Sequence, residues 1–160
     1  MIGPKLRLAV AALFLSLLSS PMSAEPPRLS LSLGIPSVGG GTETYLRYTD
    51  RARFWVLQPV YGLSLSTRGT AWAGAGLALT LRPDQGNLFL RTNSMVGAYK
   101  RGNGPDLGGP IQFRNGLDFG LTFANGAELG LGIDHRSNAG LYRINGGINT
   151  GYLFYSMALR

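Results

Sequence analysis

The feature that most constrains the fold is an alternation of apolar and polar residues that recurs along most of the chain. Between residues 111 and 123, the odd-numbered positions are apolar except at Asn115, and the even-numbered positions are polar or glycine. Residues 71–82 and 127–137 show the same period of two. Successive side chains of a strand point to opposite faces, so this period predicts strands. No segment from residue 25 onward has a helical period, and the chain is therefore predicted to be all-β.

Turn signals separate the alternating segments. Residues 83–86 (Pro-Asp-Gln-Gly) and 124–126 (Ala-Asn-Gly) predict tight turns. Gly102–Pro110 and Gly140–Gly147 predict longer loops. The eight strands predicted between these signals are 28–35, 42–49, 53–67, 70–82, 86–101, 110–124, 126–138 and 148–160.

The residue types on the two faces of these strands indicate which face is the interior. The polar face is rich in glycine and carries charges of both signs, among them Arg114, Asp118 and Glu128, which suits the narrow lumen of an eight-stranded barrel. The other face then meets lipid, and strands of about ten residues match the bilayer at barrel tilt. We predict an eight-stranded antiparallel transmembrane β-barrel of the outer membrane, with Trp55, Trp72 and the tyrosines at the membrane interfaces. The alternative is a soluble periplasmic lipid-binding barrel, which would carry more Lys, Glu and Thr outside.

The first 24 residues predict a signal peptide that is removed after export. Lys5 and Arg7 precede the apolar stretch Leu8–Leu18, which is shorter than the ~20 residues of a membrane-spanning helix, and Ala24 is the predicted cleavage position. Residues 25–160 then form a single β-barrel domain. An even number of strands places both termini in the periplasm and the two longer loops outside the cell.

The composition limits which cofactors and binding partners the protein can have. The sequence has no cysteine, so it offers neither a disulfide nor a thiolate site. One histidine without a close carboxylate predicts no metal site, and no other cofactor is indicated. The formal net charge of +7 falls to +5 when Lys5 and Arg7 are removed, which suits anionic lipid phosphates. Export and the scattered arginines argue against nucleic acid, and the oligomeric state stays open, a homodimer included.

The candidate site lies at the end of the alternation in residues 127–137. His135, the only histidine, and Ser137 have the same parity as Leu131 and Ile133, so both side chains are predicted to face lipid. A serine hydroxyl is a poor nucleophile until a base takes its proton, and histidine is the commonest such base. The pair predicts a nucleophile and a general base that act on a lipid.

A resemblance to a known family supplies the reaction. His135–Leu141 (His-Arg-Ser-Asn-Ala-Gly-Leu) and Asn145–Ile148 (Asn-Gly-Gly-Ile) resemble the outer-membrane lipid A 3-O-deacylase family, also called the PagL family. Leu121–Gly126 and Leu153–Tyr155 add to this resemblance. It implies an outer-membrane esterase that removes the 3-O-acyl chain of lipid A, with lipopolysaccharide as the substrate. Ser137 is then the nucleophile, His135 the general base, and the oxyanion is held by Asn138 with the backbone N–H groups of Ala139 and Gly140.

One position departs from the family pattern. A glutamate on the last strand orients the histidine in the family, and the matching residue here is Asn149. Asn149 has the parity of Leu153 and Tyr155, so it is predicted to face lipid beside His135. An amide can fix the imidazole tautomer but brings no negative charge. In Ser-His-Asp proteases, replacing the aspartate by asparagine lowers turnover by a factor on the order of 10⁴. The alternative function is therefore a catalytically weak or inactive barrel with a structural or lipid-organising role.

Overall fold

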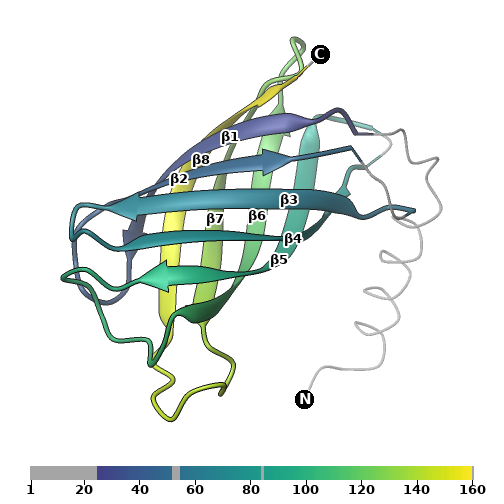
Figure 1. Cartoon of the computed structure of the whole chain (residues 1–160). Helices are drawn as coiled ribbons and strands as arrows, with labels where there is room; N and C mark the ends of the chain where they lie inside the picture. Colours follow the sequence, from purple (N-terminus) through teal and green to yellow (C-terminus); the bar gives the residue numbers. More distant parts are fainter. Residues whose placement is uncertain (1–24, 52–54, 84, 160) are drawn as a thin grey trace, which may run out of the picture.

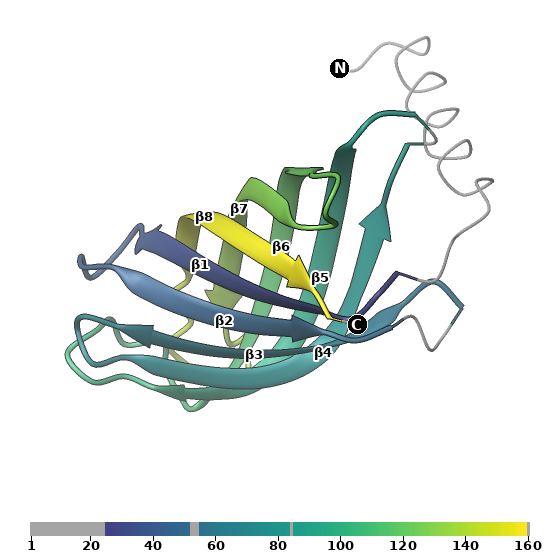
Figure 2. The ribbon, with the colours of Figure 1, turned by 90° about the horizontal axis from the view of Figure 1, so that it is seen from above.

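The computed structural model describes residues 25–51, 55–83 and 85–159, so the predicted signal peptide lies outside the described residues. Each strand pairs antiparallel with the next one in the sequence, and β8 pairs with β1 to close the barrel (Figures 1 and 2). The predicted eight-stranded antiparallel barrel is confirmed. No helix of the described residues is long and apolar enough to cross a membrane. The strands are β1 (Arg28–Pro36), β2 (Glu43–Thr49), β3 (Gln58–Ser66), β4 (Ala71–Leu81), β5 (Leu88–Lys100), β6 (Ile111–Thr122), β7 (Glu128–Ser137) and β8 (Ile148–Ala158).

The start of β3 is the one strand boundary that was predicted wrongly by more than two residues. The strand was predicted to begin at residue 53; residues 53 and 54 lie outside the described residues, and from Trp55 onward the strand begins only at Gln58. Trp55 and Val56 form a turn, and Trp55 has a φ of 58°, a left-handed conformation that an extended strand does not contain. The alternation of apolar residues thus extends past the start of the strand to Trp55, which lies in a loop. Its ring is 84 % exposed and is not part of the sheet.

Side chains alternate across the barrel wall with apolar groups outside and polar groups inside. Leu131 is 66 % exposed, whereas Arg47 and Asp118 are at most 1 % exposed. Such an exterior is unfavourable in water and favourable against lipid tails. The distribution of residues is that of a transmembrane barrel and the reverse of a soluble one.

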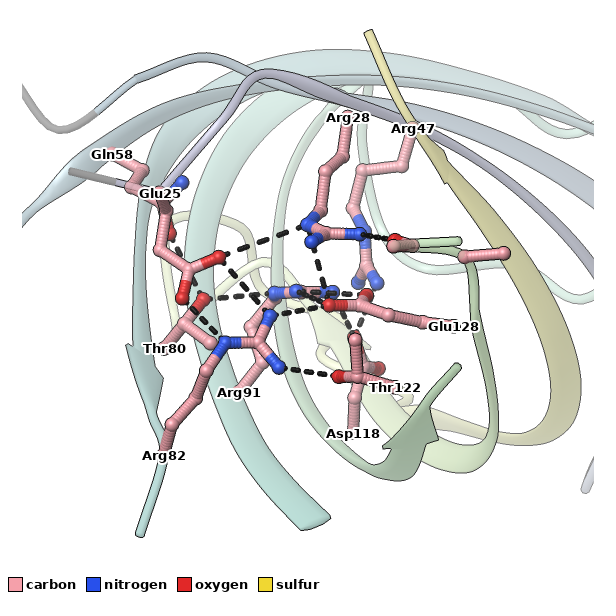
Figure 3. Close-up of polar contacts among 12 residues, drawn as sticks. Glu25, Arg28, Arg47, Gln58, Thr80, Arg82, Arg91, Asp118, Thr122 and Glu128 are labelled. Atoms are coloured by element: carbon pink, nitrogen blue, oxygen red, sulfur yellow. Dashed lines mark hydrogen bonds and ion pairs between the residues drawn. The ribbon is translucent and has the colours of Figure 1, made fainter. Parts of the chain in front are cut away.

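Charged side chains fill one end of the lumen, and we call Glu25, Arg28, Arg82, Arg91 and Glu128 the basal cluster (Figure 3). Glu128 accepts hydrogen bonds from Arg91 at 3.0 Å and Arg82 at 2.5 Å, and it lies 3.2 Å from Arg28. Glu25 pairs with Arg82 from the start of the described chain. Because these carboxylates face several guanidinium groups, their charges are compensated without water.

Four further charges lie behind the candidate site, and we call Glu43, Arg114, Asp134 and Arg136 the site-end cluster. Arg114 donates to Glu43 at 2.7 Å and to Asp134 at 2.5 Å, and Arg136 donates to Glu43 at 2.6 Å. All four residues are buried. Asp134 and Arg136 flank His135 on β7, so their inward ion pairs fix the outward direction of the His135 side chain.

Aromatic rings complete the packing of the lumen, which corrects the prediction that Trp72 lies at a membrane interface. Trp72 points inward, is 1 % exposed and packs edge-on against Tyr45 with 6.3 Å between ring centroids. Its Nε1 donates to the Gln112 carbonyl at 3.4 Å. A Cβ at Gly74 would lie 2.6 Å from the Trp72 ring, so the glycines of the polar face provide room for the large rings. Tyr99 is buried on the same side of the wall.

The two longer loops pack against each other at the end of the barrel opposite the chain termini. Leu159 N–H donates to the Pro27 carbonyl at 2.7 Å, which holds the two ends of the described chain together. At the other end, Gly108 has a φ of 86°, and a Cβ there would clash with the Ile144 carbonyl oxygen. The loop after β7, which leads into β8 (Figure 1), is thereby held against the loop after β5.

Candidate active site

His135 lies near the end of β7, and its neighbours across the sheet are Asn115 on β6 and Asn149 on β8. All three side chains are exposed on the outward face of the barrel, as the alternation predicted for His135 and Asn149. His135 Nδ1 is 2.8 Å from Asn149 Oδ1. An amide oxygen only accepts hydrogen bonds, so this contact places the proton on Nδ1 and leaves Nε2 as the basic nitrogen.

Gly147 determines where the His135 ring can lie. A Cβ at Gly147 would be 2.6 Å from Cε1 of His135 and 3.3 Å from Nε2. The imidazole therefore packs directly on the glycine backbone, and any larger residue at 147 displaces it. The sequence motif contained this glycine, but its contact with His135 is visible only in the folded chain.

Ser137 lies two residues beyond His135 on the same outward face and pairs across the sheet with Phe113. Its side chain is partly exposed. Within the described residues, no hydrogen bond joins Ser137 Oγ to His135. Catalytic hydrogen bonds are often long in structures without substrate. The structure thus joins His135 to Asn149 and places Ser137 beside them without the bond of an assembled dyad.

The loop after β7 uses two of the three predicted oxyanion donors for its own structure. Asn138 is fully buried, and its Nδ2 donates to the carbonyls of Leu107 and Ile144 at 2.7 and 2.6 Å. Its Oδ1 accepts the Gly140 N–H at 2.8 Å. The Asn138 side chain and the Gly140 N–H are therefore engaged, contrary to the expectation that both point at the substrate. Of the predicted donors, the Ala139 N–H has no hydrogen-bond partner among the described residues, and Ala139 is exposed with a φ of 52°.

Asn145 is a further donor that the sequence patterns did not single out. Its Oδ1 accepts the backbone N–H of Asn138 at 3.1 Å. This bond holds the Asn145 amide beside the peptide group that joins Ser137 to Asn138. Its Nδ2 has no partner among the described residues, and the side chain is exposed. The only signal in the sequence was the position of Asn145 in the motif shared with the family.

Nearby carboxylates have other partners and do not replace the missing glutamate. Asp134 belongs to the site-end cluster, Glu128 to the basal cluster, and Asp106 pairs with Arg101 at 3.0 Å. Across the described ranges, no group of three or more His, Cys, Asp or Glu side chains is placed to hold a metal ion. The polar chemistry beside His135 is therefore that of neutral amides and hydroxyls.

A groove of about 380 Å³ opens on the outward surface beside His135. It extends from β8 across β7 and β6 to β5. Grooves of this size accommodate small-molecule ligands or a segment of a larger one. Its lining residues are Thr92, Asn115, Gly116, Leu117, Ile133, Asp134, His135 and Asn149.

Comparison with known proteins identifies similar sequences and folds. A family model described as lipid A 3-O-deacylase (PagL) matches residues 37–158. The lipid A deacylase PagL of Pseudomonas aeruginosa is 41 % identical over 54 residues, which are 34 % of this chain and 31 % of that protein. The match thus spans about a third of this relative's length.

Two solved structures share the barrel. The crystal structure of the outer membrane enzyme PagL matches with a TM-score of 0.71 and 23 % identity, over 82 % of this chain and 99 % of that one. A de novo designed transmembrane β-barrel matches with a TM-score of 0.61 and 9 % identity, over 86 % of this chain and 98 % of that one. At these identities the structural likenesses establish the fold alone.

Proposed function

The chain belongs to the lipid A 3-O-deacylase (PagL) family, and from this we propose that it is an outer-membrane esterase that hydrolyses the ester-linked acyl chain at the 3-position of lipid A. The observation that carries the proposal is the 2.8 Å contact between His135 Nδ1 and Asn149 Oδ1 in the apolar exterior of the barrel. A histidine oriented by a polar partner on a lipid-facing surface adds nothing to an apolar exterior, and it is suited to a substrate that lies in the membrane.

In the proposed reaction, Ser137 Oγ attacks the ester carbonyl carbon while Nε2 of His135 takes the hydroxyl proton. The tetrahedral intermediate collapses when His135 returns this proton to the departing sugar oxygen. Lipid A leaves with a free hydroxyl, and the acyl chain stays on Ser137. Water then loses a proton to His135 and attacks the acyl-serine, and His135 returns this proton to the departing Ser137 Oγ, which releases the fatty acid and restores the free serine.

The neutral groups around the pair have separate tasks in this mechanism. Asn149 keeps the proton on Nδ1 of His135, so that Nε2 is free to act as the base. Without a carboxylate at position 149, the positive charge on the imidazole is stabilised less than in a Ser-His-Glu arrangement. We assign the oxyanion to the Ala139 N–H and the Asn145 Nδ2, two donors of this loop that have no hydrogen-bond partner among the described residues.

The proposed orientation in the membrane follows from the placement of the chain ends. After removal of residues 1–24, both termini lie at one end of the barrel, which we assign to the periplasm. The loops after β5 and β7 then face the outside, and the candidate site lies at the level of the outer leaflet, where lipopolysaccharide resides. Fractionation with the outer membrane after alkaline extraction, and N-terminal sequencing that starts at Glu25, test this placement.

Mass spectrometry of lipid A tests the activity directly. We expect cells whose lipid A carries a 3-O-acyl ester to lose that acyl chain when they express the wild-type protein. Expression of Ser137→Ala at the same level should leave lipid A unchanged. Unchanged lipid A with the wild type would contradict the esterase and favour a structural or lipid-organising barrel. Light scattering of the purified protein in detergent distinguishes a monomer from a homodimer.

A further inference from the structure

Polar side chains on the outer face of the strands gather on one side of the barrel. Within the described strands, the outward positions of β1, β3 and β4 hold only Leu, Ile, Ala, Pro and Tyr61, and those of β2 are Thr44, Leu46 and Tyr48. The adjacent strands β5 to β8 instead carry a polar patch around the candidate site. Its outward-facing members are Thr92, Ser94, Asn115, His135, Ser137 and Asn149.

Four of these residues form a row across neighbouring strands. The register places Asn149 opposite His135, His135 opposite Asn115, and Asn115 opposite Ser94. Asn149 is next to the start of β8, whereas Ser94 is at the midpoint of β5, so the row slants from the rim of the barrel toward the bilayer interior. Polar groups at that depth are costly unless they have hydrogen-bond partners. Asn115 is also the one position that interrupts the apolar face of β6.

The contact between Ser94 and Asn115 leaves a specific set of hydrogen-bonding groups free. Ser94 Oγ donates to Asn115 Oδ1 at 2.7 Å. The lone pairs of Ser94 Oγ and both N–H groups of Asn115 Nδ2 have no partner among the described residues. A hydroxyl group matches this pair, because it donates one hydrogen bond and accepts another. A plain hydrocarbon chain satisfies neither residue.

We propose that Ser94 and Asn115 form a subsite that binds a hydroxyl group on the acyl chain being hydrolysed. The proposal rests on the esterase function above, since the reacting carbonyl at Ser137 determines where the chain begins. Ser137 pairs directly with Phe113, so Asn115 is its diagonal neighbour, and the two side chains start about 7–8 Å apart. A hydroxyl on the third carbon of the chain is two carbons from the carbonyl at Ser137, and the Asn115 side chain can reach it across this diagonal. The groove beside His135 reaches Asn115, while Ser94 and Ser137 are not among the residues that line it.

Thr92 offers less than the Ser94–Asn115 pair. Its Oγ1 donates to the Gly116 carbonyl at 3.2 Å, so it can only accept a hydrogen bond and is not bonded to a free amide that could donate one. Ser94 and Asn115 are therefore the residues to change. The substitution Asn115→Leu extends the apolar exterior of β6, where Leu117 is 45 % exposed, and is compatible with a folded barrel.

The test compares two synthetic esters that differ only in a hydroxyl on the third carbon of the acyl chain. We expect the full mature protein in detergent micelles to prefer the hydroxylated ester by about tenfold in kcat/KM, the effect of one or two hydrogen bonds. Ser94→Ala and Asn115→Leu should each remove most of this preference. Thr44→Val, an exposed hydroxyl on β2, is the matched control and should keep the wild-type ratio. A preference that both variants retain, or an equal loss for both esters, overturns the subsite and leaves the esterase standing.

A binding readout separates the subsite from catalysis. The side-chain amide resonances of Asn115 should shift on titration with 3-hydroxydodecanoate and not with dodecanoate. If neither ester is hydrolysed but this selective shift occurs, the subsite stands and the esterase fails. If neither ester is hydrolysed and no selective shift occurs, both are wrong.

Discussion

A single methyl group at position 147 tests the geometry of the candidate site. In Gly147→Ala, the new Cβ would lie 2.6 Å from Cε1 of His135, whereas ordinary contacts begin at 3.4 Å. The ring therefore has to retreat by about 0.8 Å. Gly147 and Asn149 both lie on the β8 side of the ring, so this retreat lengthens the 2.8 Å contact to Asn149 toward the limit of hydrogen bonding.

The expected loss of activity follows from this displacement. A misplacement of about 1 Å in a catalytic group costs on the order of 10²-fold, which corresponds to about 2.7 kcal/mol of transition-state stabilisation. The loss should be mainly in kcat rather than in KM, because the variant displaces the catalytic base and leaves the other residues that line the groove in place. Initial rates on a lipid A ester in detergent micelles measure both parameters. Nitrogen-15 resonances of the imidazole report whether the proton has left Nδ1.

Gly151→Ala is the matched control. Gly151 lies on the outward face of β8, and a Cβ there meets no atom within 4 Å. This variant should retain the wild-type rate within about twofold. Heat-modifiable migration in SDS gels shows that both variants form the barrel. Activity of a folded Gly147→Ala equal to that of Gly151→Ala would refute the view that Gly147 positions the histidine.

Three further substitutions test other parts of the structure. Asn149→Glu should raise kcat by at least about tenfold, because a carboxylate stabilises the imidazolium; an unchanged or lower rate would show that the amide suffices. Asn138→Ala removes three hydrogen bonds of about 1 kcal/mol each, so it should loosen the loops after β5 and β7 and speed their cleavage in limited proteolysis; wild-type resistance would contradict this. Glu43→Gln leaves two buried arginines without their shared carboxylate, and we expect a loss of about 3–5 kcal/mol in urea unfolding from lipid vesicles. A loss below about 1 kcal/mol would mean that Asp134 compensates both arginines.

Side-chain direction was predictable from the sequence because it depends on a local period. In a strand, each residue faces opposite to its neighbour, so the parity of His135, Ser137 and Asn149 determined that all three point outward. The same period, with charged and small residues on one face, indicated eight strands around a polar lumen. It failed at Trp55, where an alternating segment continues into a turn with a left-handed residue.

The contacts of the site were decided by tertiary structure. Strand register joins residues far apart in the chain, and it brings Asn115 and Asn149 to either side of His135. Asn138 was predicted as an oxyanion donor, but the packing of the loops buries it, and its side chain holds two loops together. The alternation therefore determined on which side of the barrel wall each side chain lies, because a period of two is defined by neighbouring residues alone. Only the closed barrel determined which side chains meet, since register and loop packing depend on the whole chain.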